Sequence, residues 1–424
     1  MIAATHMAKS LFNTGDLCPR LSACYKPAAK LNPHGHTLRT LAVRSMSPTR
    51  TTANRMFLIV AWLVYAASTA PAADAPDSSF RFAQAGYRYE FPRDHGAHDE
   101  FRTEWWYYTG HLETEEGRRF GYELTFFRRG IPPDQIHTRP SRWSVDQLYL
   151  AHVAITDVSE GRFHFRDRVS RSGLGKAGAD ANRLHVWLDQ WRAEASGQSG
   201  DQQTLDARAD GMALSLTLSP LKPLVIHGEQ GLSKKGAAAG QASHYYSFTR
   251  LKTAGTMTLG TRSYTVTGMS WMDHEFGSAD LSPDLVGWDW FSMQLADNRE
   301  LMVYRLRRSD GSSDPASSGT LVFPDGRTQH LSASDIQLMP LDTWTSAASK
   351  ATYPHRWQVS IPSLGLSLKL TPLMADQELR TSRSTQVTYW EGAVAVEGTE
   401  RGQAIKGQGY VELTGYAERI EKKL

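Results

Sequence analysis

Hydrophobic and polar residues alternate along much of the chain from about residue 100 onward. The alternation is clearest in three segments, 122–126, 212–218 and 364–370. It is the pattern of β-strands that bury one face. Two further segments, 288–295 and 300–306, are separated by four polar or small residues and predict a hairpin. Few segments show the period of an amphipathic helix, so we predict an all-β fold.

Segments rich in Gly, Ser and Asp interrupt this pattern and are expected to be surface loops. They cover residues 171–182, 196–211, 233–243 and 309–319. Many strands with aromatic residues at alternate positions favour a sandwich or a barrel.

The length of the chain also bears on its organisation. The part beyond residue 75 exceeds one ordinary β-barrel, so we expect two domains. The strand pattern breaks at 278–283, which places the expected domains at 76–279 and 280–424.

The first 75 residues have a different character. Arg44, Arg50 and Arg55 precede an apolar run of twelve residues, 56–67, and small residues follow it. This order is typical of a secretory signal, and twelve residues are too few to span a bilayer, which needs about twenty. We therefore expect an N-terminal extension and cleavable signal peptide over 1–75, and a periplasmic or secreted protein. The alternative is an uncleaved amphipathic anchor.

Cysteine content and charge agree with export. Cys18 and Cys24 both lie in the leader, so the expected mature chain offers no disulfide or thiolate site. Residues 1–73 hold eight of the 47 basic residues and one of the 44 acidic ones. The remainder is mildly acidic and has no basic stripe, which argues against a nucleic-acid partner.

The segment 268–277 contains the most unusual chemistry, three ionisable residues in a row between bulky side chains. In a strand, Trp271, Asp273 and Glu275 would share one face. A carboxyl beside an indole in apolar surroundings has a raised pKa and can stay protonated. Such an acid could protonate an alkene. In the alternative, Asp273 and Glu275 cap turns at a strand end and His274 is a hydrogen-bonded partner.

Glu104 lies among four aromatic residues at the start of the first clear strand. Alternation places Glu104, Trp106 and Tyr108 on one face. This face could form the mouth of a pocket. Alternatively, Glu104 pairs with an arginine such as Arg128.

Other chemical motifs are weak. His95, His98 and His244, together with the acidic segment at 273–275, are candidate metal ligands by residue type, but no His-x-x-x-His or facial-triad spacing occurs. The chain also has no Gly-x-Ser-x-Gly elbow and no phosphate-binding loop in a strand–loop–helix context. We therefore expect no metal and no cofactor.

Five long, mostly aromatic-rich motifs resemble one known group, the carotenoid 1,2-hydratase family, also described as AttH-type lipocalin-like proteins. The resemblance runs from about Phe91 to the carboxyl terminus. It implies two tandem lipocalin-like β-barrel domains. The motifs are residues 91–96, 103–110, 273–277, 287–291 and 389–392.

The resemblance also implies an activity. The hydratases are cofactor-independent hydro-lyases that add water to a carotenoid double bond, using a His-x-Trp pair and a Tyr-x-Asp pair. The corresponding residues here are His244 with Tyr246, and Trp271 with Asp273. Asp273 would be the general acid, His244 would orient the water or Asp273, and the two aromatic residues would face the carbocation. Both aromatics are exchanged relative to the hydratase pattern, and His-Glu-Phe-Gly stands where His-Asn-Trp-Gly is usual.

Three functions follow from these observations. The first is an exported lipocalin-like protein that binds a lipophilic molecule and works with a membrane transport system. Its expected ligand-binding residues are Glu104, Trp106, Tyr108, Glu275, Trp288 and Trp290. The second is a hydratase acting on a polyene through Asp273. The third is a scaffolding partner of a membrane complex with a vestigial pocket. The sequence does not indicate an oligomeric state.

Overall fold

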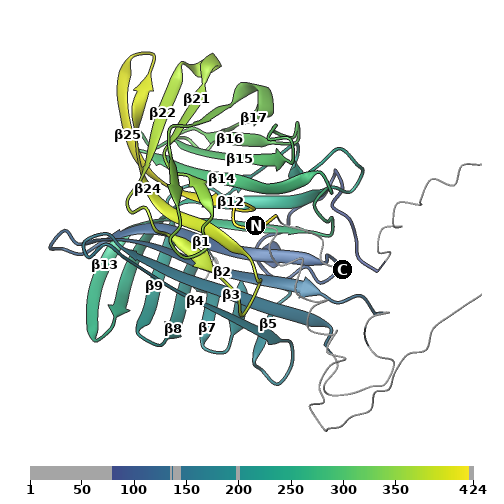
Figure 1. Ribbon diagram of the computed structural model, residues 1–424. Coiled ribbons are helices and arrows are strands. Elements are labelled where there is room, and N and C mark those ends of the chain that lie inside the picture. Colours follow the sequence, from purple (N-terminus) through teal and green to yellow (C-terminus); the bar gives the residue numbers. More distant parts are fainter. Residues whose placement is uncertain (1–78, 134–135, 137–144, 197–200, 420–424) are drawn as a thin grey trace, which may run out of the picture. The chain divides into compact units, whose positions relative to one another are not determined.

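The structure is a computed structural model that describes residues 79–133, 136, 145–196 and 201–419 (Figure 1). The expected signal peptide and both cysteines lie outside the described residues. The described chain is almost entirely β-structure, with three short 3-10 turns, η2 (Arg93–His95), η4 (Ala333–Asp335) and η5 (Pro362–Leu364). The all-β prediction is confirmed.

Two large antiparallel sheets contain nearly all of the strands. The first has thirteen strands, of which eleven follow the order β4-β3-β2-β1-β13-β12-β9-β8-β7-β6-β5, and it forms a nearly closed barrel. Its strands are β1 (Thr103–Glu113), β2 (Arg119–Gly130), β3 (Gln147–Asp157), β4 (Arg162–Arg171), β5 (Ala177–Ala179), β6 (His185–Leu188), β7 (Trp191–Ser196), β8 (Gln202–Ala209), β9 (Met212–Pro220), β10 (Val225–Ile226), β11 (Leu232–Lys234), β12 (Ala242–Leu259) and β13 (Arg262–Gly277).

The second sheet has ten strands, in the order β17-β16-β15-β14-β25-β24-β22-β21-β18 with β23 paired to β24. The small pair β19–β20 stands apart from it. The strands are β14 (Leu285–Leu295), β15 (Glu300–Arg308), β16 (Ser318–Val322), β17 (Thr328–Ser332), β18 (Gln337–Pro340), β19 (Thr343–Thr345), β20 (Thr352–Pro354), β21 (Trp357–Ile361), β22 (Leu366–Pro372), β23 (Glu378–Arg380), β24 (Thr388–Glu400) and β25 (Gln403–Leu413).

Each sheet encloses an apolar core, and a third cluster of buried residues joins the two sheets. The first core lies inside the barrel and includes Trp106 and Met272; the second includes Phe291 and Trp357. The joining cluster draws aromatic residues from β1, β12 and β13 on one side and from β14 and β15 on the other. Strands β1, β12 and β13 therefore bury both faces, one in the barrel and one against the second sheet.

Most predicted strands are present, and the predicted hairpin is the β14–β15 pair. The expected loop at 196–211 is wrong, because Gln202–Ala209 forms β8. Its inward residues are Gln203, Leu205 and Ala207, of which only one is a large apolar residue. Such a strand has little hydrophobic signal to distinguish it from a loop.

The segment between Gly277 and Leu285 connects the last strand of the first sheet to the first strand of the second, and the sequence pattern breaks there. From Asp77 onward the chain forms one compact unit that includes both sheets. The division into domains at 76–279 and 280–424 stays a prediction.

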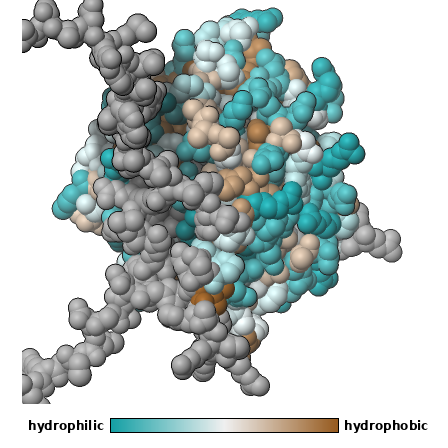
Figure 2. Space-filling view, turned by 90° about the vertical axis from the view of Figure 1, so that its right-hand side faces the viewer, coloured by the Kyte–Doolittle hydropathy of each residue, from teal (hydrophilic) through white to brown (hydrophobic). Residues whose placement is uncertain are grey.

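On the face shown in Figure 2, hydrophilic residues predominate among the described residues and hydrophobic ones form small patches. Among the described residues, the most exposed large apolar side chains are those of Leu174, Met339 and Leu221. Within the described residues, no helix is long and apolar enough to cross a bilayer.

Candidate functional site

Strand β13 presents ionisable residues on both of its faces, as the alternation predicted. Its pairing with β1 and β12 is continuous here, with Asp273 opposite Tyr107 on one side and Ser247 on the other. Residues at matched positions point the same way in an antiparallel pair. The inter-sheet face carries Trp271, Asp273 and Glu275, and the barrel face carries Met272, His274 and Phe276.

Asp273 is fully buried on the inter-sheet face. Its described hydrogen-bond partners are all neutral: Trp271 Nε1 donates at 2.6 Å, the Tyr245 hydroxyl at 2.8 Å, and the Ser247 hydroxyl also donates. Burial raises the pKa of Asp273 to about 7, against the opposing effect of these three donors. The alternative in which Asp273 caps a turn is wrong, because the residue lies within a doubly paired strand.

A hydrogen-bonded chain leads away from Asp273 toward the second sheet. His227 Nε2 lies 2.7 Å from the Ser247 hydroxyl, and His227 Nδ1 lies 2.9 Å from the Thr320 hydroxyl on β16. Burial lowers the pKa of His227 to about 3, so its ring is neutral at physiological pH. These hydrogen bonds link Asp273 on the first sheet to Thr320 on the second sheet through uncharged groups.

Aromatic rings surround Asp273. Trp290 donates to the Tyr245 hydroxyl at 3.2 Å, and its ring centre lies 6.2 Å from that of Trp271 and 5.2 Å from that of Tyr107. We call this group, with its neighbours from β1, β14 and β15, the inter-sheet aromatic cluster. It consists of Trp105, Tyr107, Tyr245, Trp271, Trp288, Trp290 and Tyr304.

A buried ion pair lies beside this cluster. Lys235 Nζ is 2.8 Å from Glu275 Oε1, and it lies 4.4 Å from the ring centre of Tyr304. Burial disfavours the charged lysine, but Glu275 and Tyr304 outweigh it and raise the pKa of Lys235. Two cavities of about 20 Å³ each are lined by both members of this pair.

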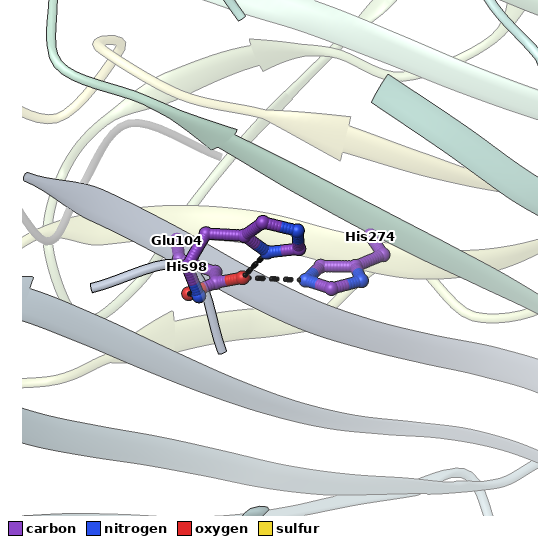
Figure 3. A group of neighbouring side chains, drawn as sticks. All are labelled: His98, Glu104 and His274. Atoms are coloured by element: carbon purple, nitrogen blue, oxygen red, sulfur yellow. Dashed lines mark hydrogen bonds and ion pairs between the residues drawn. The ribbon is translucent and has the colours of Figure 1, made fainter. Parts of the chain in front are cut away.

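A second polar group occupies the barrel face, centred on Glu104. Glu104 Oε1 accepts from His98 Nδ1 at 2.7 Å and from His274 Nε2 at 2.8 Å, so the carboxylate lies between the two rings (Figure 3). Arg128 Nε lies 2.9 Å from the other oxygen. Burial alone would raise the pKa of Glu104, but Arg128 and the two histidines hold it well below its usual value. The predicted pairing of Glu104 with Arg128 is confirmed.

Two imidazoles and a carboxylate are a donor set that zinc accepts, and the ligand atoms of His98, Glu104 and His274 lie within 4.8 Å of one another. However, each ring nitrogen already has a protein partner: His98 Nε2 lies 3.2 Å from Asp94, and His274 Nδ1 lies 2.8 Å from the Tyr246 hydroxyl. Arg128 also supplies the positive charge that a metal would supply. These residues therefore fit a closed hydrogen-bond network better than a metal centre.

The structure does not bring all of the predicted site residues together. His244 and Tyr246 lie opposite Phe276 and His274, and so they belong to the barrel face. His244 packs against Tyr87, with ring centres 4.3 Å apart, and not against Asp273. The expected arrangement, in which His244 orients Asp273 and Tyr246 faces the same cation as Trp271, is therefore corrected.

The ten predicted residues divide equally between the two faces of the sheet. Asp273, Trp271, Glu275, Trp288 and Trp290 lie on the inter-sheet face. His244, Tyr246, Glu104, Trp106 and Tyr108 lie on the barrel face.

Sequence reasoning missed Tyr245, Ser247, His227 and Lys235. Tyr245 and Ser247 alternate with the predicted His244 and Tyr246, and only the strand register shows which pair faces Asp273.

A much larger hollow than these two cavities lies elsewhere among the described residues. It is an open groove of about 1,220 Å³ at the opposite end of β1 and β13, lined by residues such as Glu113, Arg119 and Thr267. No residue predicted for the site lines it.

Comparisons with known proteins agree with this architecture. Residues 82–416 match the AttH-like family. A candidate AttH protein from Nitrosomonas europaea is 36% identical, with a TM-score of 0.70 over 81% of this chain and 99% of that one. Kievitone hydratase from Nectria haematococca is similar in fold, at 16% identity and a TM-score of 0.60, over 81% and 97% of the two chains. Among curated proteins, none matches the chain.

Proposed function

Because the chain belongs to the AttH-like family and has a lipocalin-like fold, we propose that it binds a lipophilic small molecule between its two sheets. The observation that carries this proposal is the inter-sheet aromatic cluster with its two adjoining cavities. Aromatic walls with a few placed polar groups are typical of small-molecule sites. Here the polar groups are Asp273, Glu275 and Lys235.

The position of the Lys235 side chain determines how much space a ligand would have at this site. Each cavity has room for about one water molecule, and the Lys235–Glu275 pair lines both. The lysine lies two positions before the exposed segment 237–239, and its side chain is 13% exposed. Displacement of this side chain would join the two cavities, so we propose that a ligand enters when Lys235 swings toward solvent.

Retinol, a fluorescent isoprenoid polyene, tests this proposal directly. We expect wild-type protein to bind it saturably and Trp290→Phe to weaken binding about threefold to tenfold, because part of an aromatic wall is lost. Trp357→Phe is the matched control, since Trp357 is equally buried but belongs to the core of the second sheet. The absence of saturable binding, or an equal loss in both variants, would contradict the proposal.

Hydration of a double bond is a second candidate, supported by the raised pKa of Asp273. The protonated carboxyl would transfer its proton to one alkene carbon, leaving a carbocation on the other. The faces of Trp271 and Trp290 would stabilise this cation by about 2 kcal/mol or more. A water molecule would then add to the cation and return a proton to the Asp273 carboxylate, so that H and OH are added without a cofactor.

The hydration candidate is tested with lycopene as substrate. Wild-type protein should yield a product heavier by one water, and Asp273→Asn should yield none while still binding retinol. Equal product from both proteins would exclude Asp273 as the acid. Binding of retinol without any product in wild type would leave the protein as a carrier.

We also propose that the protein is exported and works alongside a membrane transport system. This proposal rests on the signal-like order of residues 44–75 and on the AttH-type resemblance. Cell fractionation of the full-length chain and of a chain lacking residues 1–75 tests the first part. The full chain should be found outside the cytoplasm with a shortened amino terminus. Cytoplasmic retention of both proteins would contradict it.

A further inference from the structure

Two buried polar atoms on the inter-sheet face lack a partner among the described residues. They are Trp105 Nε1, a hydrogen-bond donor, and Glu275 Oε2, an acceptor. Trp105 is 3% exposed and Glu275 is fully buried. Leaving such a group unsatisfied costs about 1–3 kcal/mol each, so a pair of them indicates an absent partner.

The two atoms belong to neighbouring side chains. Trp105 on β1 and Glu275 on β13 are directly opposed in the strand register, and both line the same cavity. Cβ atoms at such positions are about 4.5–5.5 Å apart. The other oxygen of Glu275 is occupied by Lys235 and by the Ser243 hydroxyl. The free donor and the free acceptor therefore belong to adjacent side chains that line one cavity.

A hydroxyl group is the chemistry that satisfies both atoms, because it donates one hydrogen bond and accepts others. We propose that Glu275 and Trp105 form a subsite for the hydroxyl group of the bound ligand, with Glu275 Oε2 accepting and Trp105 Nε1 donating. The ligand would then be an alcohol or a phenol with an apolar body. This inference rests on the proposed function, since it names the ligand class of the same site.

The neighbouring cavity supports a ligand hydroxyl over a lone water. It lies on the other side of the Lys235–Glu275 pair and is lined by Tyr245, Trp288, Trp290 and Tyr304. A ligand whose apolar part lies in this cavity would place its hydroxyl group at Glu275. Asp273, two residues away on the same face of β13, would then lie beside the body and not beside the hydroxyl.

Retinol and its deoxy analogue, which has the same polyene without the hydroxyl, separate this inference from the proposed function. We expect wild-type protein to bind retinol about tenfold more tightly than the deoxy analogue, the effect of one or two satisfied hydrogen bonds. Trp105→Phe should reduce this preference to about threefold or less. Glu275→Gln, which keeps the shape of the side chain and removes its charge, should also reduce it.

The deoxy analogue also reports on folding, because a correctly folded variant must still bind it saturably, and any loss of aromatic wall weakens both probes alike and leaves their ratio unchanged. Trp357→Phe is the matched control: its indole nitrogen is likewise buried without a described partner, but it lies outside the site. This variant should keep the full preference.

Three outcomes would overturn the inference. Equal affinity of wild type for the two probes would mean that a water molecule occupies the subsite. A full preference retained in Trp105→Phe would place the hydroxyl elsewhere. Failure of both probes to bind would overturn the proposed function together with the inference.

Discussion

At the scale of single residues, the pKa of Asp273 is determined by two opposing effects. Three donors point at its carboxyl and favour the ionised form, but complete burial has the larger effect. A carboxyl with a pKa near neutrality can give and recover a proton at physiological pH. The aromatic surroundings that cause this shift are the same ones that we propose as the ligand site.

The shift in Asp273 predicts a pH-dependent stability. Its folded pKa of about 7 lies above the unfolded value near 4, so the folded chain holds a proton that the unfolded chain has released. The stability that this bound proton contributes is fully present below pH 4 and is lost as the pH rises to 7, at about 1.4 kcal/mol per pKa unit. Asp273→Asn should therefore lose less stability than wild type between pH 4 and pH 7.

Urea unfolding at several pH values measures this difference. Comparison with the variant cancels the other titrating groups, provided that the two proteins have the same slope against denaturant. Parallel stability curves for the two proteins would show that the pKa of Asp273 is ordinary.

At the scale of elements, strand β1, strand β2 and the segment around η2 are held together by the Glu104 network. Arg128 on β2 contacts Glu104 on β1 and donates to the backbone carbonyls of His98 and Phe101, at 2.7 and 2.8 Å. Every one of these groups is buried. The network fixes the segment around His98 against β13, where the His98 ring stacks on Phe276 with ring centres 3.6 Å apart.

Arg128→Met should destabilise the protein by about 3–5 kcal/mol, because it leaves the Glu104 carboxylate buried without its counter-charge. Arg119→Met is the matched control, a change of the same kind at an exposed position on the same strand, and should cost less than about 0.5 kcal/mol. Chemical denaturation measures both. A similar small effect of the two substitutions would show that the network contributes little.

Strand register limits how much of the site could be predicted from the sequence. Alternation on β13 correctly separated Asp273 from His274, because that requires only the strand itself. Whether His244 or Tyr245 faces Asp273 depends on the pairing of β12 with β13, and a shift of one residue reverses it. Nothing local in the sequence determines that pairing.

At the scale of the whole molecule, the sheets meet through buried polar groups as well as aromatic rings. Tyr107 donates to Glu391 on β24 at 2.6 Å, and Tyr389 donates to Glu123 on β2 at 3.2 Å. His152 on β3 lies 2.7 Å from the same Tyr389 hydroxyl. Burial and the nearby Glu412 carboxylate raise the pKa of Glu123 to about 8. Burial, Glu123 and Glu412 raise the pKa of Glu391 well above its usual value. Glu123 is therefore largely protonated in the assembled sheets at physiological pH.

A rise in pH from 4 to 8 should weaken this contact. Glu123 keeps its proton in the folded chain up to about pH 8, whereas the unfolded chain releases it near pH 4. The stability that this group contributes is thus lost as the pH rises from 4 to 8. Glu123→Gln, a neutral replacement, should lose less stability than wild type over this range. Thermal unfolding between pH 5 and pH 9 tests it. Identical pH dependence in wild type and the variant would contradict the raised pKa.

The fold class and the family resemblance could both be inferred from the sequence, since strand alternation and long aromatic motifs are local features. The contact between the sheets could not. Glu123 and Glu391 are 268 positions apart in the numbering. Glu123 lies in none of the five motifs, and although Glu391 lies in the motif 389–392, nothing in that motif indicates that it is buried against the first sheet. Burial by a distant strand is what gives these residues their chemistry.

The central claim is that a lipophilic ligand lies on the inter-sheet face and not inside the barrel. Photo-crosslinking with a diazirine-bearing long-chain alcohol, followed by peptide mass spectrometry, tests it most directly. We predict labels on inter-sheet residues such as Trp288, Trp290 and Tyr245. Labels confined to barrel residues such as Tyr108 and Phe248, or to the open groove near Thr267, would contradict the account.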